Sequence, residues 1–210
     1  MAHQKHLDLF HVSPGQRWKT NETMRNKTPE PNQPVWMTRE NLENISEFSL
    51  PKPFSLRWFR SGDEQTWLKI QSAADRDEKF TPESFAQIFG NDFSTLHERQ
   101  CFLLDAREIA IGTGTAWFDE NFEGARWGRI HWMAIAPEFQ RLGLGKALMS
   151  IVCRRLRELG HERAYLKTST PRLAAINLYL HFGFAPLIRN SEDAENWRAL
   201  QPKLKFPLGW

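Results

Sequence analysis

Cysteine is scarce in this sequence of 210 residues, and both of its cysteines, Cys101 and Cys153, lie in apolar stretches. A disulfide framework or a cysteine-based metal site needs a different pattern, so we expect two buried free thiols and no bound metal. No apolar run reaches the ~18 residues of a membrane-spanning helix, and the N-terminus lacks the apolar core of a signal peptide. These absences predict a soluble, cytoplasmic protein without a membrane partner.

A strong excess of one charge is also missing, because 28 Lys and Arg are balanced by 25 Asp and Glu to a formal net charge of +3. The basic residues are not concentrated enough to indicate a nucleic-acid partner, although they favour a polyanionic small ligand. Aromatic residues are abundant by contrast, with nine Trp, and 40% of the chain is hydrophobic. The length and this composition predict one domain with a sizeable core and an appendage.

The appendage lies at the N-terminus, where residues 1–53 show no sustained apolar period. The segment T-P-E-P-N-Q-P from Thr28 is typical of a flexible arm. We therefore expect a flexible extension over residues 1–53 and a compact domain over residues 54–206. A short part of the extension is expected to be pinned to the domain by four apolar side chains, Leu42, Ile45, Phe48 and Leu50.

From residue 54 onward, strand-like alternation and helical spacing follow each other along the chain. Strands are predicted at 54–60, 100–105, 109–118, 127–136 and 164–168, with a last strand opening at Phe184. Helices are predicted at 64–74, 82–89, 144–159 and 173–182. Glu195–Leu200 is expected to supply a final hairpin partner. The order predicts an α/β (α+β) fold, in which a mixed, mostly antiparallel sheet carries helices on both faces.

A glycine-containing loop joins the strand at 127–136 to the helix at 144–159. It reads Q-R-L-G-L-G from Gln140 to Gly145, and no acidic residue occurs from Gln140 through Val152. The first amides of a helix have no intrahelical partner, and the helix dipole adds partial positive charge there. Because glycines let an anion approach the backbone closely, the loop is expected to hold a pyrophosphate.

A second motif follows at the next helix, where Ala175, Tyr179, Gly183 and Phe184 form A-x-x-x-Y-x-x-x-G-F. Together with Q-x-x-G-x-G in the loop, this pair of motifs resembles the GNAT superfamily of N-acetyltransferases. A glycine loop alone would be weak evidence. The resemblance covers roughly residues 54–206, and its specific motifs lie within residues 130–184.

The resemblance implies transfer of an acetyl group from acetyl-CoA, as co-substrate, directly to an amine of a small molecule or protein. It places the coenzyme on the loop and on the end of the preceding strand. The implied binding residues are Met133, Ala134, Ile135, Gln140, Arg141, Leu142, Gly143, Leu144, Gly145 and Lys146. The identity of the amine, a longer acyl group and a homodimer all stay open.

The resemblance also places an acid for the departing thiolate at Tyr179, and a phenol with a pKa near ~10 suits that task. Many relatives carry a glutamate as base on the central strand, but this chain has Arg129, His131 and Met133 at those alternate positions. His131 is the candidate base, because it titrates in the useful range and strand alternation puts it on one face with Arg129 and Ile135. Acceptor-side carboxylates are also open, at Asp119, Glu120 and Glu123.

Alternatives remain for each of these assignments. Tyr179 also fits a buried structural tyrosine, and His131 also fits a histidine with no part in catalysis. The missing strand glutamate leaves a second function open, that of a non-catalytic acyl-CoA sensor or interaction module.

Overall fold

The computed structural model describes residues 32–75 and 78–208, and the first part of the expected extension lies outside them. A seven-stranded sheet runs through this part of the chain in the order β2-β3-β4-β5-β6-β1-β7. Its strands are β1 Pro34–Arg39, β2 Ser55–Trp58, β3 Gln100–Leu104, β4 Ala110–Phe122, β5 Ala125–Ile135, β6 Ala164–Ser169 and β7 Ala185–Pro186. The β5–β6 pair is parallel, and the other neighbouring pairs are antiparallel.

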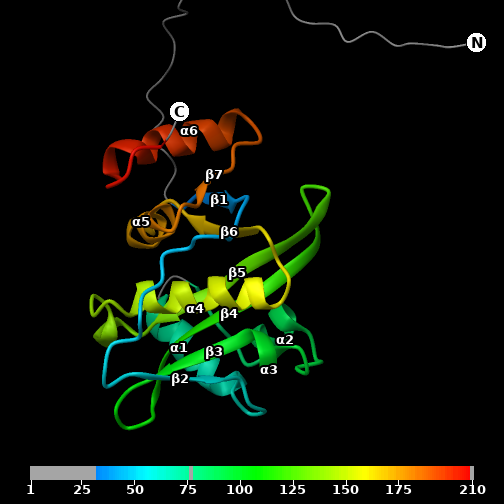
Figure 1. Cartoon of the computed structure of the whole chain (residues 1–210), viewed down its shortest axis with the longest axis vertical. Helices are drawn as coiled ribbons and strands as arrows, with labels where there is room; N and C mark the ends of the chain where they lie inside the picture. Colours follow the sequence, from blue (N-terminus) through cyan, green and yellow to red (C-terminus); the bar gives the residue numbers. More distant parts are fainter. Residues whose placement is uncertain (1–31, 76–77, 209–210) are drawn as a thin grey trace, which may run out of the picture.

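Helices cover both faces of this sheet (Figure 1). Helix α4 crosses one face of β4 and β5, whereas α1 to α3 lie behind the same strands, and α5 and α6 lie beside β6, β1 and β7. The helices are α1 Glu64–Ala74, α2 Ser84–Phe89, α3 Leu96–Arg99, α4 Leu144–Glu158, α5 Leu173–His181 and α6 Ser191–Leu200, with 3-10 turns η1 Pro137–Phe139 and η2 Gln201–Lys203. The mixed, mostly antiparallel sheet with helices on both faces is therefore confirmed.

Of the three apolar clusters among the described residues, two join the helices to the sheet. One joins α4 to the sheet and to α5 and α6, with Leu148 and Trp197 fully buried. The other joins α1 and α2 to the opposite face, where Trp67 packs edge-on against Phe85 and Phe89. We call them the α4-side cluster and the α1-side cluster.

Part of the expected N-terminal extension is integral to the sheet. Strand β1 lies between β6 and β7, and its alternate residues Val35 and Met37 are 1% and 0% exposed. The boundary expected at residue 54 is thus too late, because the pairing partner of β1, strand β6, lies far along the chain and leaves no local signal. The expected pinning is confirmed: Leu42 is fully buried, and Ile45, Phe48 and Leu50 pack against the α4-side cluster.

The C-terminal region also differs from the expectation. Residues expected to pair as a final strand, Glu195–Leu200, belong to helix α6, and the strand expected from Phe184 is only the two-residue β7. Helix α6 begins where the side chain of Asn190 accepts a hydrogen bond from the amide of Asp193, with acidic residues in the first turn. An N-cap and acidic first turn favour a helix, and β1 already occupies the strand position.

Candidate functional site

The parallel strands β5 and β6 pair over a short stretch only. Their ladder joins Gly128 to Ala164 and Arg129 to Tyr165 and then stops. Among the described residues, 130–135 of β5 therefore have no strand partner on their β6 side. This unpaired edge of β5 ends beside the start of α4.

The backbone at the end of β5 directs hydrogen-bonding groups toward that unpaired edge. The Ala136 amide donates to the Ile111 carbonyl of β4 at 2.8 Å, so the preceding pair, Ile135 and Gly112, is the non-hydrogen-bonded kind. The N–H and C=O of Ile135 thus point away from β4. The Gln140 side-chain amide donates to the Ile135 carbonyl at 2.9 Å, whereas the Ile135 N–H has no acceptor within residues 32–75 and 78–208.

A β-bulge interrupts β5 at Trp132. The pairs Thr113–Ala134 and Thr115–His131 leave two β5 residues opposite one on β4, and Trp132 has φ 47°. The side chain of Gln71 from α1 donates to the Trp132 carbonyl at 3.0 Å and holds the bulge in place. Bulges of this kind change the direction in which side chains point.

Because of the bulge, the expected alternation along β5 is wrong. The His131 ring packs at 5.7 Å from Phe89 of the α1-side cluster, whereas Met133 and Ile135 pack against the α4-side cluster. His131 and Ile135 therefore lie on opposite faces of the sheet. A one-residue shift in register reverses every later side chain, and no local sequence signal marks it.

The loop before α4 has the free amides that its sequence predicts. Within the described residues, no protein group accepts a hydrogen bond from the amides of residues 141–145, and the first bond is from Lys146 to the Gly143 carbonyl at 3.1 Å. Gly143 is the N-cap with φ 81°, a left-handed conformation that glycine adopts easily. A Cβ at Gly143 would meet none of the described residues within 4 Å, so they leave the space beside the loop open.

This loop forms one end of a groove of about 370 Å³. Helix α5 and the segment after η2 complete its walls. The lining residues are Arg141, Gly143, Gly145, Lys146, Ala174, Asn177, Leu178, His181, Lys205 and Phe206. None of these described lining residues is acidic, so the groove suits an anion.

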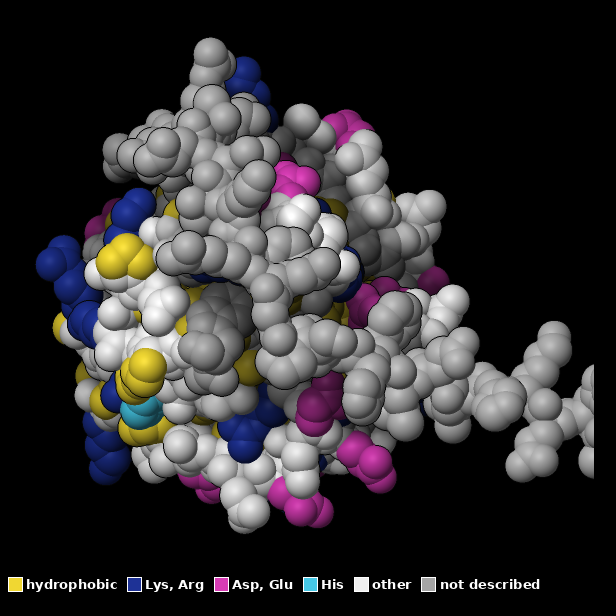
Figure 2. Space-filling model, turned by 90° about the horizontal axis from the view of Figure 1, so that it is seen from above, with side chains coloured by type: hydrophobic (Ala, Val, Ile, Leu, Met, Phe, Trp, Pro, Cys, Tyr) yellow, Lys and Arg dark blue, Asp and Glu magenta, His cyan; other side chains and the backbone are white. Residues whose placement is uncertain are grey.

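The surface view agrees with this charge distribution. Figure 2 shows most of its visible Lys and Arg side chains along the left edge, beside hydrophobic and His side chains, and most visible Asp and Glu on the right and lower parts. The left edge is where α5 and the end of α6 lie in Figure 1.

Tyr179 lies on α5 within the α4-side cluster and is 9% exposed. Burial raises its pKa to about 12, against the opposing effect of the positive charge of Arg172. Its hydroxyl forms no hydrogen bond within the described part of the chain. The side chain is thus a neutral phenol with a proton to donate and no protein acceptor.

Burial shifts the pKa of His131 in the opposite direction from that of Tyr179. His131 is 9% exposed, and burial, with a further effect of the Arg129 charge, holds the pKa of its imidazole well below the usual value. The ring is therefore neutral at pH 7. Since it faces the α1-side cluster, the structure places His131 and Tyr179 on opposite sides of the sheet.

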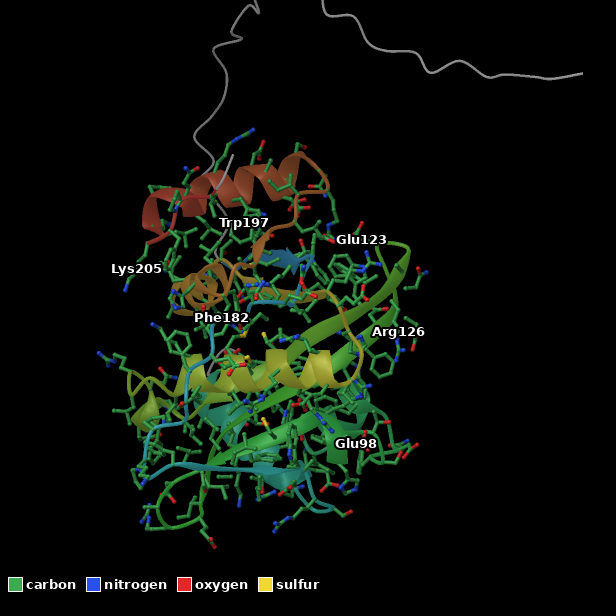
Figure 3. The ribbon with its side chains drawn as sticks, in the orientation of Figure 1. Glu98, Glu123, Arg126, Phe182, Trp197 and Lys205 are labelled. Atoms are coloured by element: carbon green, nitrogen blue, oxygen red, sulfur yellow. The ribbon has the colours of Figure 1, made fainter. Side chains whose placement is uncertain are left out.

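Two of the three candidate acceptor-side carboxylates bind other side chains of the protein. Asp119 accepts a hydrogen bond from the Tyr165 hydroxyl at 3.1 Å, and Glu120 pairs with Arg126 at 3.4 Å. Figure 3 shows Glu123 and Arg126 at the β4–β5 hairpin, on the side of the molecule away from Lys205. About 20 Å of extended strand separates Arg126 from Trp132, so these carboxylates lie far from the bulge.

Several contributors to the site were not predicted from the sequence. Gln71 holds the bulge, and an ion pair between Arg172 and Asp75 connects the start of α5 to the end of α1. Lys205 and Phe206 wall the groove. None belongs to a motif, and each reaches the site only through tertiary packing.

The expectations about metal and thiols can also be compared with the structure. Within residues 32–75 and 78–208, no three His, Cys, Asp or Glu side chains form a cluster that could hold a metal ion. Cys101 and Cys153 are buried and free, as predicted, and burial raises the pKa of each thiol to about 12. No helix of the described residues is long and apolar enough to span a membrane.

Comparisons with known proteins converge on one family. Mycothiol acetyltransferases from Geodermatophilus obscurus and Pseudarthrobacter chlorophenolicus are each 29% identical, covering 71% and 67% of this chain but 49% and 45% of their own lengths. The chain thus spans about half the length of these relatives. The structure of a GCN5-related N-acetyltransferase from Sphaerobacter thermophilus superposes with a TM-score of 0.59 at 18% identity, over 75% of this chain and 50% of that one, and shows the shared fold. Residues 56–184 match the Acetyltransferase (GNAT) family, and the chain therefore belongs to it.

Proposed function

We propose that this protein transfers an acetyl group from acetyl-CoA to an amine, without a covalent intermediate on the protein. The observation that supports it best is the set of free amides at residues 141–145, which open into a groove with no acidic lining residue. The family is one of acetyltransferases, and the relatives above are named for acetyl transfer.

The loop and β5 would bind the donor in two parts. The amides of residues 141–145, with Arg141 and Lys146, suit the pyrophosphate. Leu144 is buried, so it would contribute its amide alone, and Gln140 would act by holding the end of β5 in place. The unpaired edge at residues 133–135 suits the amides of the pantetheine arm, which would bind as an added strand does.

Three groups of the chain would then serve the transfer itself. The free N–H of Ile135 is available to the carbonyl oxygen of the thioester, where negative charge develops. The neutral Tyr179 would give its proton to the departing thiolate, and the neutral His131 would accept the proton of the amine. Because the two side chains lie on opposite faces of the sheet, the amine would lose its proton on one face and the departing thiolate would gain a proton on the other.

The curated relatives suggest an acceptor to test. They are named as mycothiol acetyltransferases, although this chain spans only about half of their length. We propose a small-molecule amine as acceptor, with the unacetylated form of mycothiol as the first compound to test. The carboxylates of the β4–β5 hairpin lie far from the bulge, so the proposal gives them no part in binding the acceptor.

The test is acetyl transfer to a panel of amines that includes this compound, followed by mass spectrometry of the product. Formation of an N-acetylated product is expected, with a lower rate for His131→Gln at unchanged acetyl-CoA affinity. Binding of acetyl-CoA in calorimetry without consumption across the panel would instead support the non-catalytic sensor. No binding at all would refute the donor site.

A further inference from the structure

The groove beside α5 extends beyond the part that a pyrophosphate would occupy. Arg141, Gly143, Gly145 and Lys146 line it at the loop, and α5 continues it toward Lys205 and Phe206. Those last two residues follow η2, outside both family motifs and outside the matched residues 56–184. Neither the two motifs nor the family match accounts for their place at the groove.

The backbone of this segment is fixed against α5. The amide of Lys205 donates to the side-chain oxygen of Asn177 at 2.7 Å, and the Asn177 side chain in turn donates to the Leu173 carbonyl at 2.8 Å. Leu208 is 3% exposed and anchors the segment from the other side. The position of Lys205 at the groove is thus built by tertiary contacts.

The Lys205 ammonium has no carboxylate partner among the residues that the structure describes. Figure 3 shows its side chain at the outer edge beside α5. Next to it, Phe206 is 36% exposed and its ring lies 5.8 Å from the ring of His181. The Lys205 ammonium next to the exposed Phe206 ring suits a nucleotide that carries a phosphate group.

Coenzyme A has two anionic groups, the pyrophosphate and the 3′-phosphate on the adjacent ribose. The free amides of the loop account for the first and leave the second without a partner. We propose that Lys205 binds the 3′-phosphate and lets the groove discriminate coenzyme A from 3′-dephospho-coenzyme A. This inference rests on the proposed function, because it presupposes that the pyrophosphate lies at the loop.

The experiment measures dissociation constants of coenzyme A and 3′-dephospho-coenzyme A by calorimetry, using the full chain and three variants. Lys205→Gln removes the charge, and Lys205→Arg keeps it. Lys203→Gln is the matched control, because Lys203 is exposed two residues earlier and does not line the groove.

Wild type is expected to prefer coenzyme A by about three- to tenfold, as befits one charge-assisted contact at an exposed site. In Lys205→Gln this ratio should approach one, through weaker binding of coenzyme A alone, while Lys203→Gln and Lys205→Arg keep it. An unchanged ratio in Lys205→Gln, an equal loss in Lys203→Gln, or no preference in wild type would each overturn the proposal. Each of these three overturning results would leave the acetyltransferase proposal intact. Failure of the wild type to bind either compound would refute both the Lys205 proposal and the acetyltransferase proposal.

Discussion

Gly143 offers the most direct way to test the donor site. It lines the groove, its φ is 81°, and a Cβ there would have no neighbour within 4 Å in the part of the chain that the structure describes. We compare Gly143→Asp with Gly143→Asn. Asn and Asp have nearly the same shape and tolerate the left-handed conformation better than other non-glycine residues, so the pair differs mainly in charge.

The size of the charge effect follows from Coulomb's law. A carboxylate about 6 Å from a doubly charged pyrophosphate, at an effective dielectric constant of roughly 40–80, weakens binding by about 1.5–3 kcal/mol. This corresponds to a roughly 10- to 100-fold higher Kd for Gly143→Asp than for Gly143→Asn. Added salt should reduce the difference, because at ~1 M the screening length falls to about 3 Å.

Calorimetric titration with acetyl-CoA at low and high salt measures this difference. Thermal unfolding of both variants checks that they fold equally well. Equal affinities of Gly143→Asp and Gly143→Asn at low salt would show that no anionic group lies beside the loop. The assignment of residues 141–145 to the pyrophosphate would then be wrong.

Three further predictions concern catalysis and stability. Tyr179→Phe should lower kcat with little change in the KM for acetyl-CoA or in Tm; wild-type kinetics would make Tyr179 purely structural. Gly183→Ala should lower the free energy of unfolding by about 1–2 kcal/mol in urea, because φ is 72° and a Cβ there is strained, while the guanidinium of Arg39, whose Nη1 would lie 2.6 Å from the new Cβ, can move aside; a loss below about 0.5 kcal/mol, the scale of a neutral surface change, would contradict the strain. Burial and the charges of Arg99 and Arg126 lower the pKa of His161 from 6.5 to about 4. Stability from this group is complete above pH 6.5 and falls toward pH 4, by up to about 3 kcal/mol; His161→Gln should flatten that slope in urea melts, and an unchanged slope would refute it.

The sequence by itself determined the elements whose signals are local. Helix α1 lies at Glu64–Ala74 as predicted, and α4 covers Leu144–Glu158, one residue short of its predicted end. Their apolar spacing and end signals act within a few turns of chain. The free amides of the anion loop follow from the same local rules, since a helix start with glycines leaves its first donors unpaired.

Only the tertiary structure decided which of these groups meet. The bulge at Trp132 reverses the faces of His131 and Ile135, and its stabilising partner Gln71 comes from a helix some 60 residues earlier in the chain. Strand β1 and the groove wall at Lys205 likewise depend on partners distant in sequence. Pairing register and packing are set by long-range contacts, so residue spacing predicts the chemistry of the loop but not the arrangement of the side chains around it.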